Sequence, residues 1–552
     1  MVAVWGARAL LTPAHHCRLD GRVVEIRVLA TQACARHLLA DLIQLQRREQ
    51  ALPRRAARHG LESSRGRQLL GDMLARHHED DSSGLVGRDG HPHSSAGSHA
   101  RFARGGSDRR WLVGNLPSTA KEHSHDPTHD DGSGRLWPLP RRHRDVGPQR
   151  ERRAPDPRPG VGDARRPFIL PAETYVPGSE TSGHWTTGNA QIPAPYPGQP
   201  VQGFSGTHRN PDGSYLVMAD NGYGVQVNSQ DFNLAVHLIR PDTATGSTTF
   251  VKQVFNLSDP NHYVPGTIWR DGGCAAATSF PAGYSCPAPD RILTGWDFDL
   301  ESMQIVPDGT FWFGEEFGPY LLHADAQGRL LQVPIPTPGV TSPSNPTLTA
   351  GQVPNLPNSK GFEGMAISPD GRTLYPMLEG VVAEDKAAGL ASDLRVFTVP
   401  LRGKGAEQFA DGFVRYRMED PSHAIGDFIA VNKHQFLVIE RDGGQGATAA
   451  FKRIYLVDMR GVADGGYLRK ALLVDLMAVP DPANVGGFGA TFTFPFVTIE
   501  DVELIDKQTI AVMNDNNFPA MGGRGPDVVD QNEYIEIRLG TPLQVDHRLL
   551  AH

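Results

Sequence analysis

The sequence is poor in cysteine and has no long apolar run. Only 4 of its 552 residues are cysteine, which excludes a small fold held together by many disulfides. No stretch approaches the roughly 18 consecutive apolar residues of a transmembrane helix, so we expect no integral membrane segment. Charged residues make up only 21%, whereas glycine and proline are frequent at 60 and 44. This composition excludes a coiled coil and is typical of a turn-rich β protein.

Several catalytic motifs are absent as well. The segment around Ser205 departs from the Gly-x-Ser-x-Gly elbow at Thr207, and no His-Glu-x-x-His helix or nucleotide-binding glycine loop occurs. A triad of Ser205, His208 and Asp220 is disfavoured, because residues three apart in a strand point to opposite faces. We therefore do not expect a serine hydrolase of this kind, a zinc protease or a nucleotide-binding enzyme.

The charge divides the chain near Pro167. Residues 1–166 hold 29 basic and 19 acidic side chains, 13 of the 22 histidines and no tyrosine, whereas the remainder holds 25 basic and 43 acidic side chains. An arginine-rich arm could bind nucleic acid, but the segment has few aromatic residues for stacking bases and no recognisable module. We interpret 1–166 as a largely disordered segment that is out of frame or wrongly annotated, and we expect no nucleic-acid partner.

From residue 168 onward the sequence predicts an all-β domain over 168–545. Short runs of β-branched and aromatic residues alternate with Pro-Asp-Gly, Asn-Gly and Gly-Gly turns. Five windows align, and their first polar positions, which step by 96, 62, 64 and 73 residues, are Ser205, Glu301, Glu363, Asp427 and Glu500. Such steps fit the blades of a β-propeller. We predict six blades, with seven as the alternative.

Each window reads as a hairpin with polar residues at the end opposite its turn. A hairpin brings its two ends together, so Glu301 should lie beside Glu316 and the other first positions beside Asp220, Glu379, Asp442 and Asp515. Equivalent blade ends share one face, so these carboxylates should converge on one rim. Carboxylates this close need neutralising partners, and calcium takes 6–8 oxygen ligands of this kind. Solvation, or ion pairs between blades, is the structural alternative.

Four segments also resemble a known family. Residues 301–320 (ESMQIVPDGTFWFGEEFGPY), 360–371 (KGFEGMAISPDG), 438–442 (VIERD) and 513–518 (MNDNNF) are similar to the phytase-like family, described as "esterase-like activity of phytase". The resemblance extends from about Phe168 to about Leu543. It implies a secreted or periplasmic propeller related in architecture to β-propeller phytases, which are calcium-dependent phosphomonoesterases. No secretory signal is recognisable at the start of the sequence, and we expect it to be lost together with the true start.

These observations predict a metal-dependent hydrolase of a small phosphate ester, with Ca²⁺ as the cofactor. Catalytic roles are assigned to Glu316, Glu363 and Arg441, and phosphate binding to Lys360 and Arg441, although an ion pair within the rim is the alternative for Arg441. The predicted metal ligands are Asp220, Glu301, Glu316, Glu363, Glu379, Asp442, Glu500, Asn514 and Asp515.

Cysteine spacing adds a prediction about compartment. Cys274 and Cys286 enclose a short loop and lack a histidine at metal-binding spacing, so we expect a disulfide and an oxidising, periplasmic or extracellular location.

Two other functions stay open. A lactonase or carboxylesterase would need a more apolar pocket, for which Trp296, Phe311, Trp312 and Phe317 are available, although such residues in strands are more often core. A propeller that binds a protein or polysaccharide without catalysis is the other alternative.

Overall fold

A computed structural model describes the chain at residues 15–19, 22–26, 163–164 and 167–550, except 277–279, 281–283, 285, 289 and 404. By its internal contacts the chain divides into two units, Met1–Arg141 and Arg142–His552. In the first unit the structure describes one antiparallel hairpin, β1 (His15–Leu19) and β2 (Arg22–Ile26). The interpretation of 1–166 as a foreign segment otherwise lies almost wholly outside the described residues.

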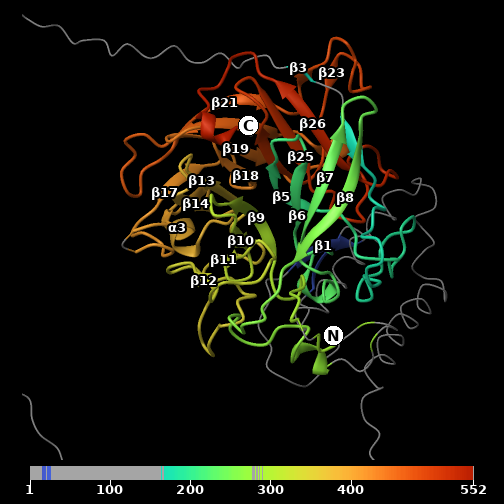
Figure 1. The fold of residues 1–552 in the computed structure, drawn as a ribbon, viewed down its shortest axis with the longest axis vertical. Helices are drawn as coiled ribbons and strands as arrows, with labels where there is room; N and C mark the ends of the chain where they lie inside the picture. The colour runs from blue at the N-terminus through green and yellow to red at the C-terminus, as the bar shows by residue number, and fades with distance from the viewer. Residues whose placement is uncertain are drawn as a thin grey trace, which may run out of the picture. The chain divides into compact units, whose positions relative to one another are not determined.

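The second unit is built largely from antiparallel sheets (Figure 1), and the two described below as the first and the fifth are joined into one nine-stranded sheet. Within each sheet, the chain begins with the strand nearest the common centre and proceeds outward. In the fifth sheet, the outermost strand comes instead from the start of the domain. The first sheet contains β5 (Phe204–Arg209), β6 (Tyr215–Ala219), β7 (Ala235–Asp242) and β8 (Ser247–Asn256). The second contains β9 (Leu300–Ile305), β10 (Phe311–Glu315), β11 (Tyr320–Ala324) and β12 (Ile335–Pro336).

The third sheet contains β13 (Gly364–Ile367), β14 (Thr373–Met377), β15 (Asp393–Val396), its continuation β16 (Val399–Pro400), and β17 (Val414–Arg417). The fourth contains β18 (Ala424–Ala430), β19 (Gln435–Arg441), β20 (Lys452–Asp458) and β21 (Arg469–Asp475). The fifth contains β24 (Ile499–Leu504), β25 (Thr509–Asn514), β26 (Asn532–Arg538) and β4 (Phe168–Leu170), with β3 (Asp163–Ala164) also pairing β26. A short ladder joins β22 (Val479–Pro480) to β23 (Thr491–Phe492).

The predicted turns form where the sequence places them. The Pro-Asp-Gly turn between β9 and β10 has Gly309 at a φ of 84°, and the equivalent turn between β13 and β14 has Gly371 at a φ of 64°. Glycine adopts this left-handed conformation without strain. The turn therefore fixes the register of each hairpin, and with it the residues that meet at the opposite end.

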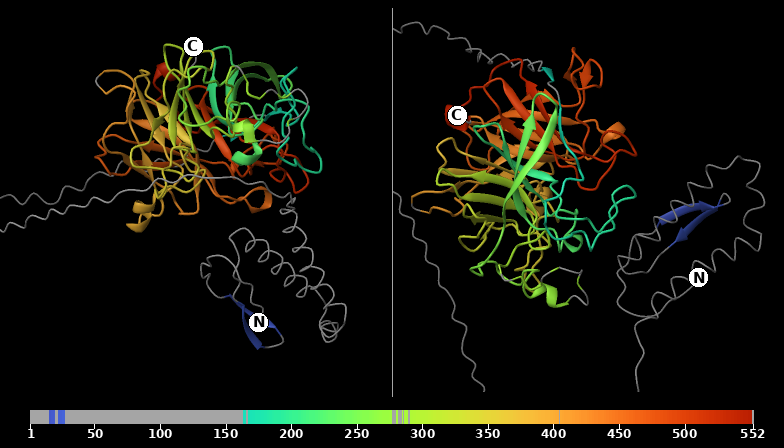
Figure 2. Two further views of the ribbon diagram at one scale, coloured as in Figure 1. Left: turned by 90° about the horizontal axis from the view of Figure 1, so that it is seen from below. Right: turned by 45° about the vertical axis from the view of Figure 1, so that its right-hand side comes forward.

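The five inner strands surround a common axis. β5 lies against β9, β9 against β13, β13 against β18, β18 against β24, and β24 against β5. The ring is closed by the start of the domain, because β4 pairs antiparallel with β26 and contacts β8 of the first sheet in parallel at Ile169 and Ser247. Both views in Figure 2 show the last strands beside the first sheet. The fold is thus a β-propeller-like ring of sheets.

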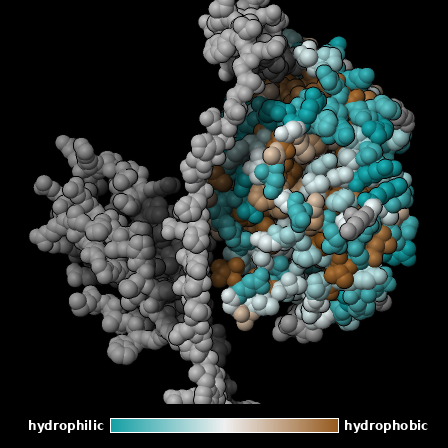
Figure 3. All heavy atoms as spheres, turned by 90° about the vertical axis from the view of Figure 1, so that its left-hand side faces the viewer, coloured by the Kyte–Doolittle hydropathy of each residue, from teal (hydrophilic) through white to brown (hydrophobic). Residues whose placement is uncertain are grey.

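Apolar side chains fill the spaces between neighbouring sheets. Val438 of β19 packs in a cluster with Met377 of the third sheet, whereas its neighbour Ile439 packs in a cluster with Val502 of the fifth. This follows from the alternation of side chains along a strand that is covered on both faces. The face shown in Figure 3 is mostly hydrophilic, with apolar residues in small separate groups.

The prediction of an all-β, propeller-like domain is confirmed, whereas the number of blades, six or seven, stays a prediction. Within the 96-residue step, the described residues of 257–299 contribute a short helix, loops and isolated β-bridges. The predicted disulfide between Cys274 and Cys286 is formed within this segment, with the Cα atoms 6.2 Å apart.

Helices are few and short. In the described residues they are α3 (Ala383–Ala387), η1 (Gln226–Asn228), η2 (Gly273–Ala276), η3 (Gly446–Thr448) and η4 (His547–Leu549). None of the helices in this part of the chain has the length and apolar character that crossing a membrane requires.

Candidate metal centre

A β-bulge places one residue of the inner strand toward the centre in most repeats. In β5, β9 and β24 the pairing with the second strand skips one residue, and the skipped residues are Ser205, Glu301 and Glu500. A bulge leaves its extra residue outside the ladder and redirects its side chain. Glu363 occupies the equivalent position directly before β13. The inner strands thereby present their polar residues at one end of the ring.

The second strand of each hairpin returns a polar residue to the same end. Directly after β6 and β10, and two residues after β14, these are Asp220, Glu316 and Glu379. Their backbone N–H groups donate to the carbonyls of Gly203, Asp299 and Gly361, two residues before the inward-facing residue in each case. Asp515 follows β25 in the same way. Four of the first positions and their partners thus come together, as the hairpin argument predicts.

The fourth repeat differs from the sequence-based alignment by one residue. Ile425 pairs with Glu440 and Asp427 with Ile439, so the skipped residue of β18 is Gly426 rather than Asp427. Ala424 pairs with Arg441, which makes Arg441 the counterpart of Asp515. A shift of one residue in a strand turns a side chain to the other face. The fourth repeat therefore offers a glycine and an arginine where the others offer carboxylates or a serine.

The carboxylates of the remaining repeats form three overlapping groups. In each group the residues offer oxygens that lie within 4.8 Å of one another. The groups are Asp220, Asp299 and Glu301; Glu301, Glu363 and Glu500; and Glu316, Glu363 and Glu379. Oxygen ligands at this density are the donor set that a hard divalent cation such as Ca²⁺ requires.

Two protein cations lie on one side of this cluster. The Nη2 atom of Arg441 is 2.8 Å from Glu363 Oε1, 3.0 Å from Glu500 Oε1 and 3.5 Å from Glu379 Oε1. The Nζ atom of Lys360 forms an ion pair with Glu379. Arg441 is almost fully buried, whereas 42% of the Lys360 side chain is exposed. The ion pair within the rim that sequence analysis held open for Arg441 is the arrangement found.

Burial and mutual repulsion raise the pKa values of the acids. Burial, and then the charge of neighbouring carboxylates, raises the pKa of Asp220, Glu301, Glu316 and Glu363 well above their ordinary range. The pKa of Glu500 rises to about 8 through burial and the charge of Asp515. Burial raises the pKa of Asp515 to about 6. Burial by itself would lower the pKa values of Lys360 and Arg441, but the negative charge of the nearby glutamates has the larger effect and raises them. Both side chains therefore stay cationic.

The polar contacts of the cluster are incomplete in a way that fits a metal ion. Glu301 is 9% exposed, and in the described residues the hydrogen-bonding neighbour of its carboxyl is another carboxyl, that of Asp299. The Oε1 atom of Glu379 is buried without a hydrogen-bond partner. Buried carboxylate oxygens normally receive donors or coordinate a metal. The donor set is therefore suited to hold a cation.

Three predicted metal ligands, Asp442, Asn514 and Asp515, lie outside these groups. Asp442 accepts hydrogen bonds from the N–H groups of Gly444, Ala450 and Phe451 and pairs with the buried Lys452 at 3.0 Å. The carboxylate thus organises the loop that follows β19. Asn514 is fully buried, and its side-chain oxygen accepts the N–H of Glu533 at 2.7 Å, so it joins β25 to β26.

Sequence reasoning did not single out Asp299. This residue is 2% exposed, and its Oδ1 accepts hydrogen bonds from the backbone N–H and the side-chain amide of Asn221. The signal was limited to proximity in sequence, because Asp299 stands two residues before Glu301 but lies outside β9. The hypothetical partners Ser205 and His208 are separated as expected, with Ser205 bonded to Glu500.

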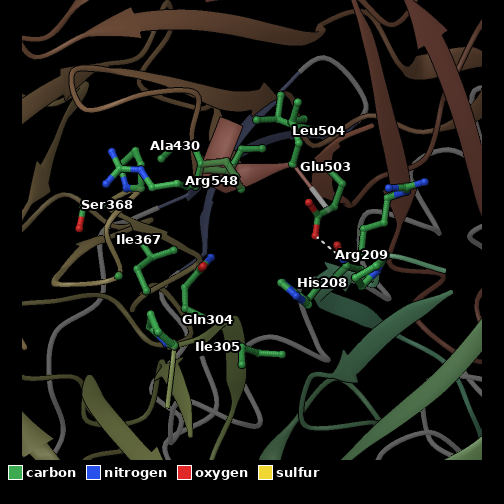
Figure 4. Close-up of a pocket in the computed structure, with 18 residues that line it drawn as sticks. His208, Arg209, Gln304, Ile305, Ile367, Ser368, Ala430, Glu503, Leu504 and Arg548 are labelled. Atoms are coloured by element: carbon green, nitrogen blue, oxygen red, sulfur yellow. Dashed lines mark hydrogen bonds between the residues drawn. The ribbon is translucent and has the colours of Figure 1, made fainter. Parts of the chain in front are cut away.

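The other end of the inner strands forms a cavity of about 450 Å³ (Figure 4). Each inner strand contributes to its wall, and Arg548, Leu549 and Leu550 of the C-terminal segment complete it. His208 and Glu503 lie on this wall, and Oε1 of Glu503 accepts the backbone N–H of Arg209 at 3.1 Å. The acidic cluster and this cavity are therefore at opposite ends of the same strands.

Comparison with known proteins identifies one family. The family model "Phytase-like: Esterase-like activity of phytase" matches residues 199–518, which is more than half of the chain. An "uncharacterized secreted protein" of Arthroderma benhamiae is 27% identical over 184 residues, and this match covers 28% of the chain and 36% of that relative's length.

Solved structures with some similarity include two enzymes. A PQQ-bound aldose sugar dehydrogenase from Streptomyces coelicolor is 11% identical, with a TM-score of 0.29 over 69% of this chain and 99% of that one. A luciferin-regenerating enzyme is 11% identical, with a TM-score of 0.28 over 61% of this chain and 78% of that one.

Proposed function

We propose, from the premise that this chain belongs to the phytase-like family described as "esterase-like activity of phytase", that it is a metal-dependent hydrolase of phosphate esters with Ca²⁺ as its ion. The observation that carries this proposal is the convergence of carboxylates from four repeats into three groups with oxygens within 4.8 Å. Burying this many carboxylates without a bound cation is unfavourable, because each negative charge raises the free energy of the ionised form of its neighbours.

The chain's own residues have distinct parts in this proposal. Asp220, Asp299, Glu301, Glu316, Glu363 and Glu500 offer the ligand oxygens. When bound, a divalent cation neutralises phosphoryl oxygens and lowers the pKa of water. Glu316 and Glu363 lie in one group, and one of them would accept the proton of the attacking water as its oxygen bonds to phosphorus. The same carboxyl would pass this proton to the leaving alcohol oxygen as the ester bond breaks. Lys360 is the cation with exposed surface, so it is better placed than Arg441 to contact the phosphate.

Two further features support a proposal about the protein's location. The disulfide between Cys274 and Cys286 requires an oxidising compartment. The relative from Arthroderma benhamiae is described as secreted. We propose an extracellular location, and the periplasm is the other compartment with the required chemistry.

The lactonase or carboxylesterase alternative receives less support. Phe311, Trp312 and Phe317 are buried in the core, and Trp296 alone of the four aromatic residues retains partial exposure. In the described residues these side chains therefore do not form an apolar substrate pocket. A non-catalytic propeller is the outcome if no ester is hydrolysed.

An assay of the full chain separates these functions. Phosphomonoester, phosphodiester, lactone and aryl-ester substrates are compared with added calcium and with chelator, for the wild type, Glu363→Gln and the exposed control Glu173→Gln. We expect calcium-dependent phosphomonoester hydrolysis that Glu363→Gln lowers at least 100-fold and Glu173→Gln leaves unchanged. Lactone or aryl-ester hydrolysis alone, or phosphate release that persists in chelator, would contradict the proposal.

A further inference from the structure

We propose that Arg441 takes the place of a bound cation in the fourth repeat, and that the metal ion binds at the neighbouring group of Asp220, Asp299 and Glu301. This inference rests on the proposed function, because it assigns the position of the metal within the same site. It also assigns Arg441 a positioning role in place of direct contact with substrate.

The first argument is the pattern of the repeats. The second, third and fifth repeats each present two carboxylates, and the first presents Ser205 and Asp220. The fourth presents Gly426 and Arg441 at the same two positions. Gly426 has no room for a side chain, because a Cβ atom there would lie 1.8 Å from the carbonyl oxygen of Ile499. One repeat has therefore exchanged its acids for a cation.

The second argument is the geometry of Arg441. A single nitrogen of its guanidinium contacts Glu363 and Glu379 of the third repeat and Glu500 of the fifth. Both acidic groups that contain Glu363 are thus contacted by this one atom. This nitrogen carries positive charge and contacts carboxylate oxygens from separate strands, as a bound metal ion would in such a site. Lys360 adds a second positive charge at Glu379.

The third argument is the lack of ion pairs in the group of Asp220, Asp299 and Glu301. In the described residues no lysine or arginine forms an ion pair with Asp220, Asp299 or Glu301. Asn221 donates to Asp299, and Gly222 donates to Asp220 at 2.9 Å, but the carboxyl of Glu301 faces the carboxyl of Asp299. Within the described residues, Glu301 is thus a buried acid that lies against another acid and pairs with no protein cation.

Asp515 strengthens the negative charge at this position. A Cβ atom on Gly203 would lie 2.8 Å from Oδ1 of Asp220 and 3.3 Å from Oδ1 of Asp515, so both carboxylates border the same glycine. Within the part of the chain that the structure describes, these four carboxylates have no ion pair with a protein cation, so they require a divalent ion more than the Arg441 side does. Carboxylates together with an amide neighbour favour a hard ion that takes oxygen ligands, such as Ca²⁺.

Calcium stoichiometry of the full chain tests the inference. The chain is stripped with chelator and titrated with CaCl₂ by calorimetry, with bound calcium counted by elemental analysis and Tm measured with and without calcium. We expect Asp299→Asn to weaken calcium binding at least 10-fold. Arg441→Gln should bind one more calcium than the wild type and gain a larger rise in Tm on calcium addition. Arg441→Lys keeps the charge and should keep the wild-type stoichiometry.

The outcomes distinguish the two proposals. If the wild type binds no calcium, the metal premise of the proposed function fails and this inference fails with it. If the wild type binds calcium but Asp299→Asn binds it equally well, only the inference is overturned. A folded Arg441→Gln protein without an additional ion would overturn the role of Arg441. Should Arg441→Gln fold only with calcium, the ion has replaced the guanidinium and the inference is supported.

Discussion

The hydroxyl of Ser205 donates a hydrogen bond of 2.9 Å to Oε2 of Glu500, joining the first inner strand to the last. The other oxygen of the same carboxylate contacts Arg441 at 3.0 Å, so Glu500 is held from both sides. Ser205 therefore serves as a donor that orients an acid. The residue that could activate it as a nucleophile, His208, lies at the opposite end of the strand on the wall of the cavity.

Ser205→Ala should therefore leave hydrolysis largely intact. We expect a loss of about 1 kcal/mol in the free energy of unfolding, from one buried hydrogen bond, and less than a 10-fold decrease in the turnover rate. Labelling with a serine-reactive phosphonate should not occur in either protein. Near-complete loss of turnover in Ser205→Ala, together with phosphonate labelling of the wild type, would instead identify Ser205 as a nucleophile.

Lys360→Met should raise KM for a phosphomonoester about 10-fold or more while changing kcat little. The reason is that Lys360 is the partly exposed cation of the site, and a point charge contributes to phosphate binding in the ground state as well as in the transition state. Steady-state kinetics measure the split between the two constants. Lys386→Met, on the exposed face of α3, is the matched control and should change neither.

Gly426→Ala should destabilise the fold strongly, by about 3 kcal/mol or more, because its methyl group would meet the backbone carbonyl of Ile499. Neither strand can retreat without breaking the contact between β18 and β24. Gly443→Ala is the control, since a Cβ atom there meets nothing within 4 Å. Chemical denaturation of both variants measures the difference, and equal stability would mean that the inner strands are not packed this closely.

Glu503→Gln should remove part of the dependence of stability on pH. Burial, and then the charge of Asp427, raises the pKa of Glu503 to about 8 from an ordinary value of 4.5. The folded protein then binds a proton more tightly than the unfolded chain, so stability falls as pH rises from about 4.5 to about 8 and is level above that. Glutamine does not titrate, so the Glu503→Gln variant should not show this loss of stability.

Denaturation of both proteins at pH 5, 7 and 9 checks this prediction. Relative to Glu503→Gln, the wild type should lose about 1–3 kcal/mol between pH 5 and pH 9. Titrating groups remote from Glu503 are shared by the two proteins and cancel in the comparison, whereas Asp427 and Asp501 interact with its charge and contribute to the difference. Parallel stability curves would show that Glu503 titrates at its ordinary pKa in the folded protein.

Much of the architecture could be predicted because it is local. The hairpins around the turns at Gly309 and Gly371 are encoded by turn chemistry and alternating side chains, both of which are visible in one sequence. The five inner strands and most of their acids follow from repeating that pattern. The number of blades could not be predicted from the repeat spacing, because the 96-residue step could hold either a further blade or an insertion.

The acidic rim was predicted in outline and misassigned in detail at the fourth repeat. In the sequence alignment of the repeats, Asp427 and Asp442 occupy the positions of the acids in the other windows. The register of β18 and β19 places Gly426 and Arg441 at the site instead. A bulge moves the alignment by one residue, and a sequence pattern does not show on which side of an acid the bulge falls. Asp299 was missed for a related reason, since it precedes the first residue of its strand.

The sequence by itself determined the repeating hairpins, their polar ends and the excess of acid over base, since each depends on residue type and short-range spacing. Only the tertiary structure decided which acids share a site and which cation joins them. The bulges turn Glu301 and Glu500 inward, and packing of β18 against β24 brings Arg441 to Glu363 and Glu500. Contacts between strands that are 60 or more residues apart arise from closure of the ring, which no local pattern specifies.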